Sequence, residues 1–107
     1  MLAVEPGAFR TRAYAGFAGQ SIDERVPDYW PMLAAVRDGM IAEDGEQPGD
    51  PERGVRAVIA AIDQDDPPQR LVLGSAGYDR VLHRLEAVLA ELRGQEAVAR
   101  AADFPAA

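Results

Sequence analysis

Two short apolar segments constrain the fold of this chain more than any other feature. The first, in residues 1–5, contains Leu2-Ala3-Val4 and is followed by a Pro-Gly turn; the second, residues 70–73, is closed by Gly74. Both are typical of short buried strands. Because helical sequence lies between them, we expect the strands to pair in parallel. A two-stranded parallel sheet leaves unpaired N–H and C=O groups along an edge, so the pattern predicts the end of an α/β sheet rather than a whole one.

A long irregular region, residues 12–45, follows the first predicted strand. It begins with a loop rich in Ala and Gly, and Ser21–Glu24 fits a helix-capping box. A helix with one apolar side comes next and is expected to end near Gly39. The region therefore predicts a loop with irregular helices.

Two longer helices flank the second predicted strand. Asp50-Pro51 is a clear helix start, and apolar residues at i, i+3, i+4 and i+7 predict a helix over 51–63. A second apolar stripe predicts a helix over 76–93, and the Ala-rich tail 95–107 is expected to fray.

The composition of the 107-residue chain excludes several kinds of chemistry. It has no Cys, a single His (His83), and neither Lys nor Asn, because all 11 basic residues are Arg. Disulfides, thiolate metal sites, three-His zinc sites and lysine Schiff bases are therefore ruled out. A net charge of −7 argues against nucleic-acid binding. No apolar run approaches the roughly 20 residues that span a bilayer, and no secretory signal opens the chain, so we expect a cytoplasmic protein with no membrane partner.

Three segments together resemble the short-chain dehydrogenase/reductases. They are Leu2–Thr11, similar to the late strand and Pro-Gly turn of that family; Gln47–Pro51, similar to its Gly-Asp-Pro helix start; and Arg70–Ala76, similar to its last strand and final turn. The resemblance covers residues 1 to about 95 and implies the C-terminal part of a doubly wound parallel, Rossmann-like sheet, mostly helical with two short parallel strands. Residues 1–107 would then be a partial dinucleotide-binding oxidoreductase domain.

The resemblance also implies site residues and a cofactor, NAD or NADP. By position in the motif, Pro6 and Gly7 would lie beside the nicotinamide, and the hydroxyl of Thr11 would hydrogen-bond the cofactor. The region after Thr11 matches the variable substrate lid of the family, where Phe17, Tyr29 and Trp30 would supply apolar walls. The reaction implied is hydride transfer between a nicotinamide and an alcohol or ketone.

The chain departs from the family at the residues that carry the reaction. No G-x-G-x-x-G turn precedes a helix, and the family's catalytic Tyr-x-x-x-Lys and Asn cannot exist without Lys and Asn. We therefore assign no catalytic residue and no metal site, and expect a C-terminal segment that is not competent alone. The alternatives are a non-catalytic interaction or dimerisation module, or a fragment without function. The expected partner is a second copy or a missing N-terminal segment, bound through helices 51–63 and 76–93 and strand 70–73.

Overall fold

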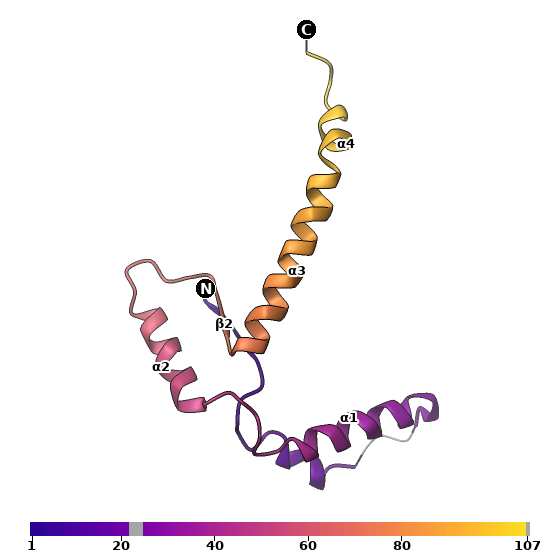
Figure 1. The fold of residues 1–107 in the computed structure, drawn as a ribbon, viewed down its shortest axis with the longest axis vertical. Coiled ribbons are helices and arrows are strands. Elements are labelled where there is room, and N and C mark those ends of the chain that lie inside the picture. The colour runs from indigo at the N-terminus through magenta and orange to yellow at the C-terminus, as the bar shows by residue number, and fades with distance from the viewer. Residues whose placement is uncertain (22–24, 107) are drawn as a thin grey trace.

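A computed structural model describes residues 1–21 and 25–106, and in it a small parallel sheet carries helices that extend away from it (Figure 1). The predicted capping box at Ser21–Glu24 falls mostly outside the described residues. The elements in chain order are strand β1 (Ala3–Pro6), 3-10 helices η1 (Ala15–Gly19) and η2 (Pro27–Tyr29), helices α1 (Trp30–Ala42) and α2 (Pro51–Ile62), strand β2 (Arg70–Leu73), and helices α3 (Ser75–Gly94) and α4 (Glu96–Ala101).

Strands β1 and β2 form a parallel pair, as the sequence predicts. The register runs from Ala3 opposite Arg70 to Pro6 opposite Leu73. The amide of Gly7 continues the ladder by donating to the Leu73 carbonyl at 2.8 Å. The α/β fold class, a partial Rossmann-like sheet of two short parallel strands, is confirmed.

Helix α2 begins where its local sequence predicts. The Asp50 side chain accepts from the backbone amides of Glu52 at 2.9 Å and Arg53 at 3.3 Å. Pro51 occupies the first helical position, where its missing N–H costs nothing. This cap fixes the point at which the chain turns back toward β2.

Two element ends differ from the sequence predictions. Helix α1 continues beyond Gly39 to Ala42, and the Gly39 carbonyl accepts from the Glu43 amide at 3.1 Å. A helical glycine costs only about 1 kcal/mol relative to Ala, too little to stop a helix by itself. The predicted fraying of 95–107 is wrong for helix α4, where good helix formers and the Arg100–Glu96 ion pair at 2.8 Å support one more helical segment.

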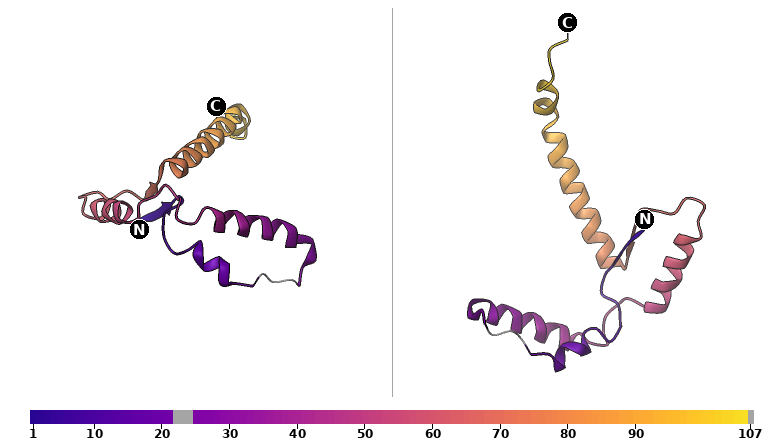
Figure 2. Two further views of the ribbon diagram at one scale, coloured as in Figure 1. Left: turned by 60° about the horizontal axis from the view of Figure 1, so that its bottom comes forward. Right: turned by 180° about the vertical axis from the view of Figure 1, so that it is seen from behind.

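The helices spread outward instead of closing around a core. The radius of gyration is 20.8 Å, against about 13 Å for a compact domain of this length. The exposed area is 9,064 Å², against about 5,800 Å² for a folded chain of this mass. Among the described residues, only Ala61 and Gln47 are buried. Figure 2 shows α1, α2 and α3 leaving the sheet in different directions. Large apolar side chains on each of them, such as Val36, Ile59 and Leu85, are about half exposed.

Among the residues that the structure describes, none of the helices combines the length and the apolar composition that a membrane span requires.

Candidate functional site

The turn after β1 lies at the carboxyl ends of both strands. Pro6 is the last residue of β1, and the Gly7 amide is hydrogen-bonded to the Leu73 carbonyl. Helix α3 starts two residues after Leu73. In open parallel sheets, ligands bind outside the carboxyl ends of the strands. The predicted residues Pro6 and Gly7 therefore occupy the edge of the sheet at which a ligand site is expected.

Gly7 makes a close backbone contact with the first turn of α3. A Cβ added at Gly7 would lie 3.3 Å from the Leu73 carbonyl oxygen and 3.6 Å from the Gly77 nitrogen. A Cβ added at Gly77 would in turn lie 3.4 Å from the Gly7 Cα. The two glycines thus let strand and helix meet, a role for Gly7 that the sequence analysis did not identify.

The ring of Phe9 lies among three further glycines. A Cβ on Gly49 would lie 2.7 Å from the ring's Cγ, one on Gly54 would lie 2.7 Å from Cε1, and one on Gly74 would lie 3.8 Å from Cε2. We call these four residues the Phe9–glycine cluster. It joins the turn after β1 to the start of α2 and to the turn before α3. The glycines at positions 49 and 54 were the only sequence signal for this cluster. Nothing in the sequence indicates that Phe9 is the side chain that packs against them.

Backbone hydrogen bonds reinforce this junction. The Arg10 amide donates to the Gly49 carbonyl at 2.8 Å, and the Gly49 amide donates to the Ala8 carbonyl at 2.9 Å, so Phe9 and Gly49 form an isolated parallel bridge. The Arg10 Nε donates to the Gln47 carbonyl at 3.1 Å. The segment after β1 is therefore held by this single bridge beside the loop that enters α2.

A cleft of about 630 Å³ opens at this junction. Its walls come from residues 7–9, 48–50, 53, 54, 57 and 73–77. The amino-terminal ends of α2 and α3 both border the cleft; Asp50 caps α2, whereas no side chain caps α3. The arrangement gives a mostly apolar hollow at the carboxyl edge of the sheet, with one carboxylate and one arginine, Arg53, on its rim.

Thr11 lies further along the same loop and does not line the cleft. Its amide donates to the Phe9 carbonyl at 2.9 Å, and its hydroxyl oxygen accepts from the Ala13 amide at 3.2 Å. The side chain is exposed, and no described residue accepts a hydrogen bond from its hydroxyl. Thr11 therefore lies on the loop that follows Gly7, and its hydroxyl group is free to donate a hydrogen bond.

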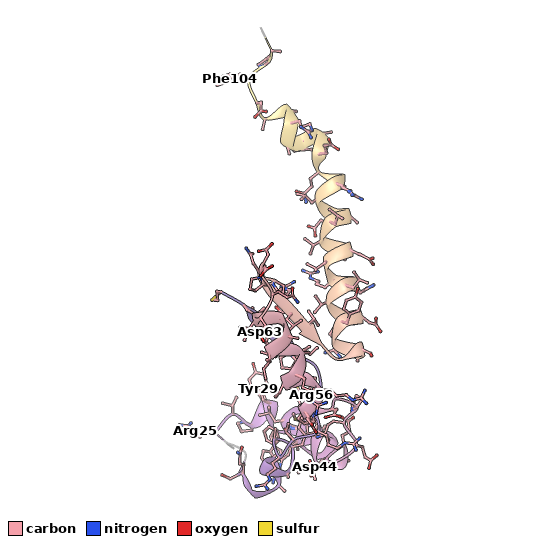
Figure 3. All side chains as sticks on the ribbon, turned by 90° about the vertical axis from the view of Figure 1, so that its left-hand side faces the viewer. Arg25, Tyr29, Asp44, Arg56, Asp63 and Phe104 are labelled. Atoms are coloured by element: carbon pink, nitrogen blue, oxygen red, sulfur yellow. The ribbon has the colours of Figure 1, made fainter. Side chains whose placement is uncertain are left out.

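The predicted lid residues lie on a separate arm. Phe17, in η1, lines a hollow of about 220 Å³ against the apolar side of α1. Tyr29 and Trp30 stand at the start of α1 with 59% and 37% of their surfaces exposed, and neither lines that hollow. Figure 3 shows Tyr29 in the lower part of the molecule, away from α3. The structure therefore does not bring the three aromatic residues together around one cavity.

No group of three or more His, Asp or Glu side chains within residues 1–21 and 25–106 is placed to hold a metal ion.

Comparison with known proteins identifies a similar solved structure. A short-chain dehydrogenase from Streptomyces avermitilis is 36% identical in sequence and superimposes with a TM-score of 0.61. The match covers 96% of this chain and 36% of the dehydrogenase, so the chain spans about a third of that enzyme's length. No protein-family model matches the chain, and no curated protein does.

Proposed function

We propose that this chain is the C-terminal portion of a short-chain dehydrogenase/reductase and forms the nicotinamide-side part of an NAD(P)-dependent oxidoreductase, because a solved short-chain dehydrogenase matches 96% of its length at 36% identity. The substrate class is an alcohol or a ketone, and the location is the cytoplasm. The single observation that carries the proposal is the Pro6-Gly7 turn at the carboxyl edge of a parallel strand pair, inside a segment similar to a dehydrogenase.

The residues present suit one end of a nicotinamide dinucleotide. The turn at Pro6 and Gly7 offers backbone at the edge of the sheet, and Thr11 offers a hydroxyl whose proton is free to be donated. A bound dinucleotide would supply the hydride donor or acceptor. The chain contains no glycine-rich turn of the dinucleotide-binding type, so the remaining contacts would come from residues outside it.

The apolar arm built from η1, η2 and α1 suits a substrate cover. Phe17 packs against α1 and Trp30 is partly covered, so both lie on one helical unit joined to the sheet by the loop after Thr11. We propose that Phe17, Tyr29 and Trp30 each contribute to the substrate cover of the completed enzyme, although this chain alone does not gather them around one cavity. Such a cover would exclude water from the reacting atoms.

The chain does not contain the groups that would move a proton in this family. Tyr78 is followed four residues later by Leu82, and no tyrosine is followed by lysine at that spacing because lysine is absent. Hydride transfer therefore requires groups from another segment. We propose that this segment binds along α2, β2 and α3, whose apolar sides are open.

A chimera tests the proposal. Residues 1–107 replace the matching third of the Streptomyces avermitilis dehydrogenase, and oxidation of NADH and NADPH is followed with a panel of ketones. The proposal expects activity in the chimera and none in the isolated chain. A folded chimera that binds neither NADH nor NADPH would overturn it; circular dichroism and calorimetry give the two readouts.

A second candidate function rests on the open surface. The chain exposes about 3,300 Å² more than a compact chain of its mass, which is typical of a subunit that is completed by a partner. A non-catalytic interaction module predicts a stable dimer that ignores both cofactors. Two measurements on the purified chain distinguish this function from the first: its mass in solution, and its titration with NADH and NADPH.

A further inference from the structure

An arginine lines the hollow between η1 and the apolar side of α1. Figure 2 shows these two elements side by side, in a part of the molecule away from α3. The hollow measures about 220 Å³, and Phe17, Leu33, Val36 and Met40 supply most of its wall. Within the described part of the chain, Arg37 is the only charged residue on this wall, so a single positive charge faces an apolar surrounding.

The guanidinium of Arg37 is only partly hydrogen-bonded. Its Nη2 donates to the Ala18 carbonyl at 3.2 Å, which ties α1 to η1. Its Nε is buried and has no hydrogen-bond partner among the described residues. No described carboxylate forms an ion pair with Arg37. Because a guanidinium is always charged and carries five N–H donors, donors remain at this site and no described group balances the charge.

The chemistry of this hollow suits a carboxylate that carries an apolar chain. An ionised group in an apolar setting costs free energy unless an opposite charge or hydrogen bonds accompany it, so buried charges are normally paired. A guanidinium fork matches the two oxygens of a carboxylate, and such charge-assisted bonds are about twice as strong as neutral ones. Apolar walls with a few placed polar groups are the usual makeup of a small-molecule site.

We propose that this hollow binds a carboxylate with a short apolar chain, with the carboxylate on Arg37 and the chain against Phe17 and Leu33. The size of the hollow sets the length of the chain. An apolar cavity of about 150 Å³ accommodates benzene, so 220 Å³ accommodates a chain of about six carbon atoms. The site uses neither the Gly7 turn nor Thr11, and it leaves α2, β2 and α3 to the segment proposed to bind there.

The inference deepens the proposed function and rests on it for one point, the identity of the ligand as substrate. Since the arm is proposed to cover the substrate, the alcohol or ketone carries a carboxylate at the end of its chain remote from the reacting carbon. The substrate class is then a hydroxy acid or an oxo acid. Recognition by Arg37 selects these acids over neutral compounds of the same length, because a neutral end leaves the buried Nε without a charged partner.

Binding to the isolated full chain tests the site without any cofactor. Hexanoate and hexanol have the same chain length and differ in the group that meets Arg37. Calorimetry gives the dissociation constant of each, and the NMR signal of the Arg37 Nε–H reports the contact directly. The proposal expects hexanoate to bind about tenfold more tightly than hexanol, because its hydrogen bond to the guanidinium is charge-assisted. It also expects hexanoate, and not hexanol, to shift the Nε–H signal.

Substitutions of Arg37 assign any preference for the acid to this side chain. Arg37→Gln removes the charge but keeps a donor for the Ala18 carbonyl, and it is expected to abolish the tenfold preference. Arg37→Lys keeps the charge without the fork and is expected to retain part of it. Arg12→Gln is the matched control, because Arg12 is exposed and does not line the hollow; the preference should stay at its wild-type value. Circular dichroism confirms that each variant keeps its helix content.

Two results of these titrations overturn the site. One is a wild-type chain that binds hexanoate no more tightly than hexanol. The other is a preference for hexanoate that persists in Arg37→Gln, since the carboxylate then binds elsewhere.

The dehydrogenase chimera separates this inference from the proposed function. The ketones 7-oxooctanoate and 2-octanone present the same methyl ketone with and without a carboxylate. The inference expects kcat/KM to be about tenfold higher for the acid, and Arg37→Gln to remove that difference. Equal kcat/KM values for the two ketones leave the proposed function standing and overturn the substrate class, because a carboxylate of the N-terminal segment then occupies Arg37. A chimera that binds neither cofactor overturns the proposed function, while the hexanoate titration still decides the site.

Discussion

Replacing Gly54 with Ala tests whether the Phe9–glycine cluster holds the chain together. A Cβ at Gly54 would lie 2.7 Å from Cε1 and 3.3 Å from Cζ of Phe9. The ring has little room to retreat, because a Cβ on Gly49 would already lie 2.7 Å from its Cγ. Overpacking of this kind lowers the free energy of unfolding by about 1–3 kcal/mol. The higher helix propensity of Ala offsets up to about 1 kcal/mol of that loss. We expect the free energy of unfolding to fall by about 1–2 kcal/mol.

Gly39→Ala is the matched control. Gly39 also lies in a helix, α1, and a Cβ there meets nothing within 4 Å, so only the helix propensity changes and the free energy of unfolding should rise by about 0.5–1 kcal/mol. Urea unfolding followed by far-UV circular dichroism measures both. With a slope near 1 kcal/mol per molar urea, the urea midpoint should fall by about 1–2 M for Gly54→Ala and rise by about 0.5–1 M for Gly39→Ala.

Phe9→Leu provides a second test of the same contact. Leu lacks the ring atoms that Gly54 accommodates, so Phe9→Leu combined with Gly54→Ala should cost less than the sum of the two single changes. If Gly54→Ala stabilises the chain as Gly39→Ala does, Phe9 does not pack on α2 and the reasoning fails.

Three further predictions concern the helix start, the sheet and the proposed cofactor contact. Asp50→Ala should lower the free energy of unfolding by about 1 kcal/mol, because it removes the cap on the Glu52 amide, whereas Asp50→Asn should keep most of it; urea unfolding measures both. Glu5→Gln removes the Arg70 ion pair at 3.1 Å, whose side chains are partly exposed, and should cost less than about 1 kcal/mol, an effect that disappears in high salt. Thr11→Val in the dehydrogenase chimera should raise the KM for NADH with unchanged circular dichroism, and Thr11→Ser should restore it; equal KM values for all three would contradict the assigned contact.

The parts of the fold that depend on local chemistry could be predicted from the sequence. Asp50-Pro51 identifies the start of α2 because a carboxylate cap and a proline at the first position act within one helical turn. The β2 segment is recognisable because four residues bounded by Pro and Gly are too few for a helix. Parallel pairing followed because a helix lies between the two strands.

The features that sequence did not predict depend on contacts between distant residues or on small energy differences. Phe9 meets Gly49 and Gly54 across some forty residues of chain, and no local pattern records which ring a glycine accommodates. The close approach of Gly7 to Gly77 has the same origin. The end of α1 was misplaced because a glycine's helix penalty of about 1 kcal/mol is smaller than the sum of the surrounding contributions.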